Sequence, residues 1–93
     1  MHILLIEDDN ETASYLIKGL KESGHVVDRA SDGKEGLFMA LDSNFDALIV
    51  DRMLPELDGL SLISKIREKN SDIPIIILSA LGEVDERVKG LKH

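Results

Sequence analysis

The chain has 93 residues, which suits one domain, because single domains commonly contain about 100–150 residues. With 43% hydrophobic residues it is too apolar to be disordered, and its formal net charge of −7 argues against direct binding of nucleic acid phosphates. It contains no cysteine, which excludes disulfides, thiolate metal sites and cysteine nucleophiles.

Short apolar runs alternate along the chain with longer segments of helical period. The runs predict strands at 3–6, from Val26 to a turn signal at 31–33, at 47–50 and at 75–78. Between and after them, apolar residues recur every three or four positions, as in amphipathic helices. These residues are Ala13, Leu16, Ile17 and Leu20; Gly36, Leu37, Ala40 and Leu41; Gly59, Leu62, Ile63 and Ile66; and Val84, Val88 and Leu91.

Capping signals delimit the predicted helices. We expect Asn10 or Thr12 to cap the first helix and Gly24 to follow its end, and we expect the third helix to close at Asn70, ahead of Pro74. Strands and helices thus alternate, with connections too long for hairpins. Right-handed crossovers then give an α/β fold, a doubly wound parallel sheet with helices on both faces.

Three carboxylates and a hydroxyl follow the predicted strands. Glu7 and Asp8 come directly after the first strand, Asp51 after the third and Ser79 after the fourth. In such sheets, ligands bind beyond the carboxyl ends of the strands. Clustered carboxylates are costly unless a cation relieves them, and Mg²⁺ prefers carboxylate, water and phosphate oxygens. The pattern predicts an acidic magnesium site for phosphoryl transfer, with Asp51 as the nucleophile.

Some neighbouring residues have a simpler structural explanation. Asp9 and Glu11 favour the N-terminus of the next helix through its dipole, whereas Asp51 stands too far ahead of the helix that starts near Gly59. We expect Met53 to fill the core. No glycine-rich phosphate-binding motif follows the first strand, so nucleotide binding has no support.

Three segments in register resemble the receiver domain of two-component response regulators, and the resemblance spans the whole chain. They are the strand with its acidic pair at 3–8, the phosphoacceptor segment at 47–59 and the switch strand at 73–80. The details at 53–55 and 81–82 are most similar to the OmpR/PhoB-type transcriptional regulators.

The resemblance implies a role for each matched residue. Asp51 would accept a phosphoryl group from a sensor histidine kinase, Ser79 would supply a hydroxyl to a phosphoryl oxygen, and Ala80 would offer its backbone N–H to the same group. The implied magnesium ligands are Glu7, Asp8, Asp51 and the backbone carbonyl of Met53. The domain would assist its own phosphorylation and dephosphorylation without being a conventional enzyme.

The resemblance also implies a fifth strand, a lysine followed by proline, a fifth helix and a DNA-binding output domain. The sequence to His93 lacks them, so we expect residues 1–93 to be a truncated receiver domain with strand order 2-1-3-4, acting on DNA only through the missing output domain. A bare edge at 75–78 predicts a homodimer through the fourth strand and helix. We expect a cytoplasmic protein, since no secretory signal is visible and apolar runs such as 75–78 are far shorter than the ~20 residues of a membrane span.

Two other functions remain open. An aspartate-nucleophile phosphatase would also use an acidic magnesium site, but it expects a second carboxylate two residues after Asp51, where this chain has Met53. A receiver-like interaction module with little phosphorylation is disfavoured by the complete acidic set, although the missing lysine leaves it open.

Overall fold

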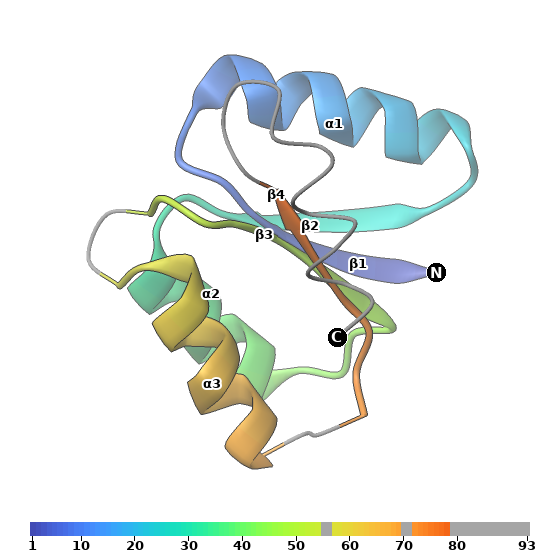
Figure 1. Ribbon diagram of the computed structural model, residues 1–93. Coiled ribbons are helices and arrows are strands. Elements are labelled where there is room, and N and C mark those ends of the chain that lie inside the picture. The colour runs from blue at the N-terminus through green and yellow to red at the C-terminus, as the bar shows by residue number, and fades with distance from the viewer. Residues whose placement is uncertain (55–56, 70–71, 79–93) are drawn as a thin grey trace.

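A parallel sheet of four strands, in the order β2-β1-β3-β4, forms the centre of the computed structural model, which describes residues 1–54, 57–69 and 72–78 (Figure 1). The strands are β1 (His2–Ile6), β2 (Val26–Ala30), β3 (Ala47–Asp51) and β4 (Ile75–Leu78), and the helices are α1 (Asn10–Glu22), α2 (Gly33–Asp42) and α3 (Gly59–Lys69). The predicted fold class and strand order are confirmed. The predicted fourth helix, and Asn70 as the end of the third, lie outside the described residues.

Helices cover both faces of the sheet, α1 on one and α2 with α3 on the other (Figure 1). Alternate side chains of β1 therefore enter two separate clusters: Leu5 packs with Ala13 on the α1 side, and Leu4 packs with Leu62 on the other. A strand buried on both faces needs apolar residues at every position, which explains the uninterrupted apolar runs.

The register places the carboxyl ends of the strands at one edge of the sheet. Ile6 of β1 pairs with Ala30 of β2 and with Val50 of β3, and Asp51 pairs with Leu78 of β4. The loops that leave these ends therefore meet at the same edge, where this fold class binds its ligands.

Helix α1 begins with a different cap from the one expected. Its N-cap is Asp9, whose carboxylate accepts a hydrogen bond from the Thr12 backbone N–H at 2.8 Å, so the prediction of Asn10 or Thr12 is wrong. An N-cap must accept from an N–H two or three residues further on, and the short Asp9 side chain stands at that distance. Gly24 follows the C-cap with φ of 90°, as expected for a residue that ends a helix.

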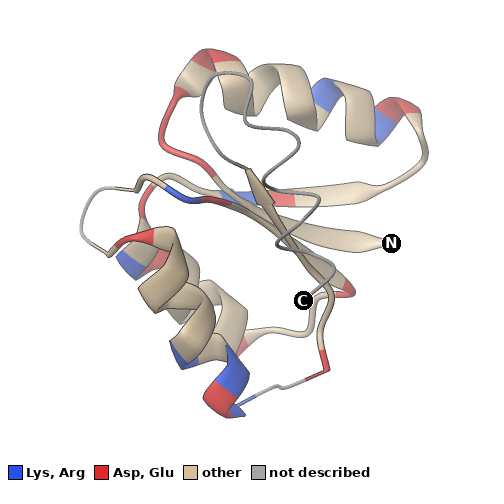
Figure 2. Cartoon of the chain, in the orientation of Figure 1, with Lys and Arg blue, Asp and Glu red and all other residues tan. Residues whose placement is uncertain are grey.

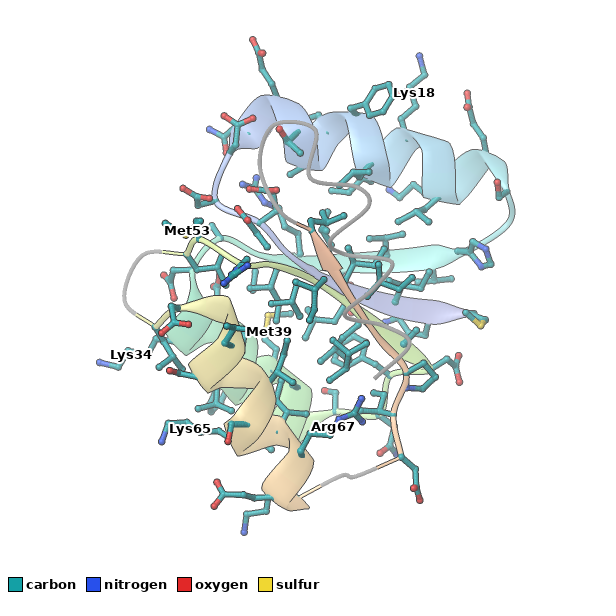
Figure 3. All side chains as sticks on the ribbon, viewed as in Figure 1. Lys18, Lys34, Met39, Met53, Lys65 and Arg67 are labelled. Carbon is teal, nitrogen blue, oxygen red and sulfur yellow. The ribbon has the colours of Figure 1, made fainter. Side chains whose placement is uncertain are left out.

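Helix α2 presents a slightly different face to the core than its apolar pattern predicted. Leu37, Ala40 and Met39 pack against the core, and Figure 3 shows Met39 between α2 and the sheet. Leu41, which was expected in the buried stripe, is 47% exposed. Because α2 lies against both the sheet and α3, the packing of the three elements decides which side chains turn inward.

Among the described helices, none has the length and apolar character needed to cross a membrane.

Candidate functional site

Three carboxyl groups meet at the carboxyl edge of the sheet. Glu7 and Asp8 lie in the loop after β1, and Asp51 is the last residue of β3. Figure 2 shows the acidic loop that follows β1 beside the end of the sheet. Each of the three side chains offers an oxygen atom within 4.8 Å of the other two. The sequence-based expectation that these residues converge is confirmed.

The three groups differ in their exposure to solvent. Asp8 is exposed, Asp51 is half-buried, and Glu7 is only 4% exposed. Burial raises the pKa of the Glu7 carboxyl from 4.5 to about 7; the Asp9 N–H acts against this shift, and the nearby Asp51 and Asp8 add to it. Ionising Glu7 beside two other carboxylates is therefore costly, and a bound cation would relieve that cost.

The donor set fits a hard divalent cation. Carboxylate oxygens are ligands that Mg²⁺ prefers, and this ion commonly uses one or two of them together with water and phosphate oxygens. Asp8 is exposed to solvent and Asp51 is half-buried, so solvent reaches these two carboxyl groups. Among the described residues, the carboxyl oxygens of Glu7, Asp8 and Asp51 could thus hold such a cation together.

Backbone contacts fix the segment around Asp51. Its Oδ1 accepts a hydrogen bond from the Met53 N–H at 3.1 Å, and the Arg52 N–H donates to the Leu78 carbonyl at 2.8 Å. The Gly59 N–H donates to the Arg52 carbonyl at 2.9 Å. A Cβ on Gly59 would lie 2.5 Å from the Asp51 carbonyl oxygen, so glycine permits α3 to start directly against the end of β3.

The side chain of Met53 does not fill the core. It is 69% exposed, and Figure 3 shows it at the end of the sheet beyond β3. The prediction of a core position is wrong because the chain has already left the sheet at this residue, so no helix covers the side chain on the described part of the structure. The Met53 backbone stays tied to Asp51 through the hydrogen bond to Oδ1.

Two predicted site residues, Ser79 and Ala80, lie outside the described residues.

Asp9, which the sequence attributed to a helix terminus, lies at the N-terminus of α1. Its Oδ2 accepts hydrogen bonds from the Thr12 N–H at 2.8 Å and the Thr12 hydroxyl at 2.6 Å. These two bonds hold the pKa of the Asp9 carboxyl below its usual value. The structural explanation of Asp9 is confirmed.

One residue at the site was missed by sequence reasoning. Arg29 of β2 donates from its guanidinium to the backbone carbonyls of Glu7 and Asp8. The sequence offered one signal: Arg29 stands near the end of β2, and β2 lies beside β1, which the acidic pair follows. This position indicates that Arg29 is near the acidic loop, but which backbone carbonyls it contacts depends on the three-dimensional geometry.

The comparisons with known proteins agree on one family. A model of the response regulator receiver domain matches residues 3–93. The transcriptional regulatory protein CusR of Escherichia coli K12 is 42% identical over 92 residues, which are 99% of this chain and 40% of CusR. QseB of Haemophilus influenzae is 45% identical over 92 residues, which are 99% of this chain and 42% of QseB. The chain thus spans about two fifths of the length of these relatives.

Solved structures give the same picture. The receiver domain of the Francisella response regulator 1452 has a TM-score of 0.85 and 38% identity, and the match covers 98% of this chain and 75% of that one. The response regulator TrrA of Thermotoga maritima, solved in complex with Mg²⁺ and BeF, has a TM-score of 0.83 and 28% identity, with 97% of both chains covered. With the family model matching nearly its whole length, this chain belongs to the response regulator receiver domain family.

Proposed function

We propose that this chain is the phosphoacceptor domain of a two-component transcriptional regulator and that Asp51 receives the phosphoryl group. The observation that carries the proposal is the position of the Asp51 carboxyl, at the end of a central strand and within 4.8 Å of oxygen atoms of Glu7 and Asp8. The bond from the Met53 N–H to Oδ1 fixes the orientation of the Asp51 carboxylate. A nucleophile for phosphoryl transfer needs this kind of positioning more than it needs chemical activation.

The donor in this proposal is a phosphohistidine of a sensor histidine kinase. A carboxylate oxygen of Asp51 attacks the phosphorus atom, the phosphorus–nitrogen bond breaks, and its electron pair stays on the imidazole nitrogen. The product is an acyl phosphate on Asp51. The donor reaches Asp51 from solvent, to which Asp8 is exposed and Asp51 is partly exposed.

Magnesium would supply positive charge next to the transferred group when it is bound. We assign its binding to Glu7, Asp8, Asp51 and the backbone carbonyl of Met53, with carboxylate oxygens as suitable donors. The structure of TrrA with Mg²⁺ and BeF supports this assignment by similarity. We further assign the Ser79 hydroxyl and the Ala80 N–H to the phosphoryl oxygens, on the resemblance of the 73–80 segment to the family.

The relatives suggest what the domain controls. CusR and QseB are transcriptional regulatory proteins, and this chain matches about two fifths of each. We propose that residues 1–93 act as the receiver part of a longer regulator and that phosphorylation of Asp51 controls DNA binding by an output domain. In this proposal the domain also assists its own dephosphorylation, the hydrolysis of the acyl phosphate on Asp51.

Phosphorylation by a small donor tests the proposal. Incubation with acetyl phosphate and Mg²⁺ should add the mass of one phosphoryl group to the intact protein, and hydroxylamine, which cleaves acyl phosphates, should remove it. Asp51→Asn should abolish the addition. Asp58→Asn is the matched control, because Asp58 is an exposed aspartate in the loop that follows Asp51. Its carboxylate accepts hydrogen bonds from the Ser61 hydroxyl and the Leu60 N–H. Modification of Asp51→Asn to the same extent as the unaltered chain would refute the assignment.

A further inference from the structure

Arg29 reaches the acidic loop from the neighbouring strand β2. Its Nε and Nη2 donate to the Glu7 carbonyl at 3.1 Å and 2.9 Å, and Nη2 also donates to the Asp8 carbonyl at 3.3 Å. The next residue of β2, Ala30, accepts the Glu7 N–H at 3.0 Å. The end of β2 therefore binds the loop after β1 at the Glu7 N–H, the Glu7 carbonyl and the Asp8 carbonyl.

These contacts hold the backbone that carries two of the carboxylates. A peptide unit is planar, so fixing its carbonyl also fixes the N–H on its other side. The unit whose Asp8 carbonyl accepts from Arg29 carries the Asp9 N–H, and this N–H donates to the Glu7 Oε2 at 3.1 Å. The preceding unit, whose Glu7 carbonyl accepts two bonds from the guanidinium, carries the Asp8 N–H. Arg29 thus fixes both peptide planes that flank the Asp8 side chain.

We propose that Arg29 is a positioning residue for the magnesium site: its planar guanidinium orients the loop so that the Glu7 and Asp8 carboxylates point at a common cation. The inference rests on the proposed function, since it gives Arg29 a role at that same site. Three donors in a fixed plane suit this task, because lysine has the same charge but cannot form the fork-shaped pair of bonds to one carbonyl.

A purely electrostatic role predicts the opposite effect on cation binding. A positive guanidinium near an acidic site repels a second cation, so removing it should strengthen Mg²⁺ binding if charge alone matters. If Arg29 orients the ligands, removing it should weaken Mg²⁺ binding although the site becomes more negative. The sign of the change therefore separates the two roles.

Mg²⁺ titration of the full chain by calorimetry provides the test, with Arg29→Leu, Arg29→Lys and the control Arg52→Leu. Mutating residues that orient metal ligands typically lowers metal affinity by about 10–100-fold. We therefore expect Arg29→Leu to raise the Mg²⁺ dissociation constant about tenfold. Arg29→Lys should show most of that loss, since it keeps the charge without the paired bonds. Arg52→Leu removes an exposed cation that directly follows Asp51 and should leave binding equal or tighter. Equal or tighter binding by Arg29→Leu, or full recovery by Arg29→Lys, would overturn the proposal.

A metal-free measurement separates this inference from the proposed function. The Asp9 amide proton, which donates to Glu7, should exchange with solvent faster in both Arg29 variants and at the original rate in Arg52→Leu. An unchanged Asp9 exchange rate in folded Arg29→Leu and Arg29→Lys would also refute the positioning role. By contrast, failure of acetyl phosphate to modify Asp51 in the unaltered chain would refute the proposed function, whatever the exchange rates are.

Discussion

Ile6 of β1 lies beside Val50 of β3 in the register of the sheet, so the two strands reach its edge together. The residues that follow them, Glu7 and Asp51, consequently bring two carboxyl groups to one place, and Glu7 is almost fully buried there. Pairing of two apolar strand residues thus forces two acidic groups together. The free-energy cost of ionising Glu7 beside Asp51 can be measured in the metal-free protein.

The metal-free protein should lose stability as the pH rises from about 4.5 to about 7. The pKa of Glu7 is raised from 4.5 to about 7 in the folded chain, so the folded state holds more protons than the unfolded state within this window. The free energy of unfolding therefore falls with rising pH until Glu7 is fully ionised. Urea unfolding in the presence of EDTA, at intervals between pH 4.5 and 8, measures this slope.

Glu7→Gln is the variant that isolates this effect, because glutamine keeps the size of the side chain and does not titrate. The part of the slope due to Glu7 should disappear in it. The lowered pKa values of Asp9 and Asp58 affect stability only in more acidic solution, where those carboxyls gain their protons. The same slope in both proteins would show that Glu7 is not the responsible group.

Magnesium should stabilise the chain through the acidic cluster. A ligand that binds only the folded state raises the free energy of unfolding by ~2.7 kcal/mol when its free concentration is a hundred times its dissociation constant. Asp8→Asn should remove most of this gain, because Asp8 belongs to the cluster. Asp9→Asn is the control, since asparagine can still cap α1. Thermal unfolding with and without Mg²⁺ measures the effect, and a melting temperature indifferent to Mg²⁺ would contradict it.

Gly59→Ala should be destabilising by ~1–3 kcal/mol, as for other overpacked positions, because its new Cβ would lie 2.5 Å from the Asp51 carbonyl oxygen. The displacement should also slow phosphorylation of Asp51. Gly19→Ala is a matched control inside α1, where a Cβ meets nothing within 4 Å. It should stabilise the chain by about 0.5–1 kcal/mol through helix propensity. Equal effects of the two substitutions on urea unfolding would contradict the steric argument.

The sequence was sufficient to predict features that follow from periodicity and strand order. The apolar runs located the strands, and the alternation of strands and helices gave the parallel topology. Because the carboxyl ends of parallel strands share one edge, the positions of Glu7, Asp8 and Asp51 directly after strands predicted their convergence. Each of these inferences depends on local pattern and on general rules of chain topology.

Other features depend on three-dimensional geometry that has no sequence period. The contact of Arg29 with the Glu7 carbonyl joins residues 22 positions apart and uses a backbone acceptor, which any residue would offer. The exposure of Met53 and Leu41 depends on where the chain leaves the sheet and on how α2 packs against α3. The choice of Asp9 as the cap depends on the direction in which the loop enters α1.

We predict that residues 1–93, taken alone, form a homodimer through the outer edge of β4. Among the described strands, β4 is hydrogen-bonded to β3 alone, and its four residues include no charge or proline that would discourage pairing with another chain. Ile76, which is 46% exposed, pairs with Ile49 on the α1 face and would be covered in such a dimer. The opposite edge strand, β2, carries Asp28 and Arg29 and is protected by these charges. Light scattering and sedimentation at micromolar concentrations should therefore detect a dimer.

Lysine substitutions at the two edges distinguish this dimer from non-specific association. In a two-fold dimer through β4, Ile76→Lys places two like charges near each other across the interface, and such pairs cost several kcal/mol. Ile76 is a better site for this change than Ile77, which packs against the core. Val26→Lys, at a 62% exposed position on the β2 edge, should leave the dimer intact. A monomer in the unaltered chain, or equal dissociation constants for both variants, would rule out pairing through β4.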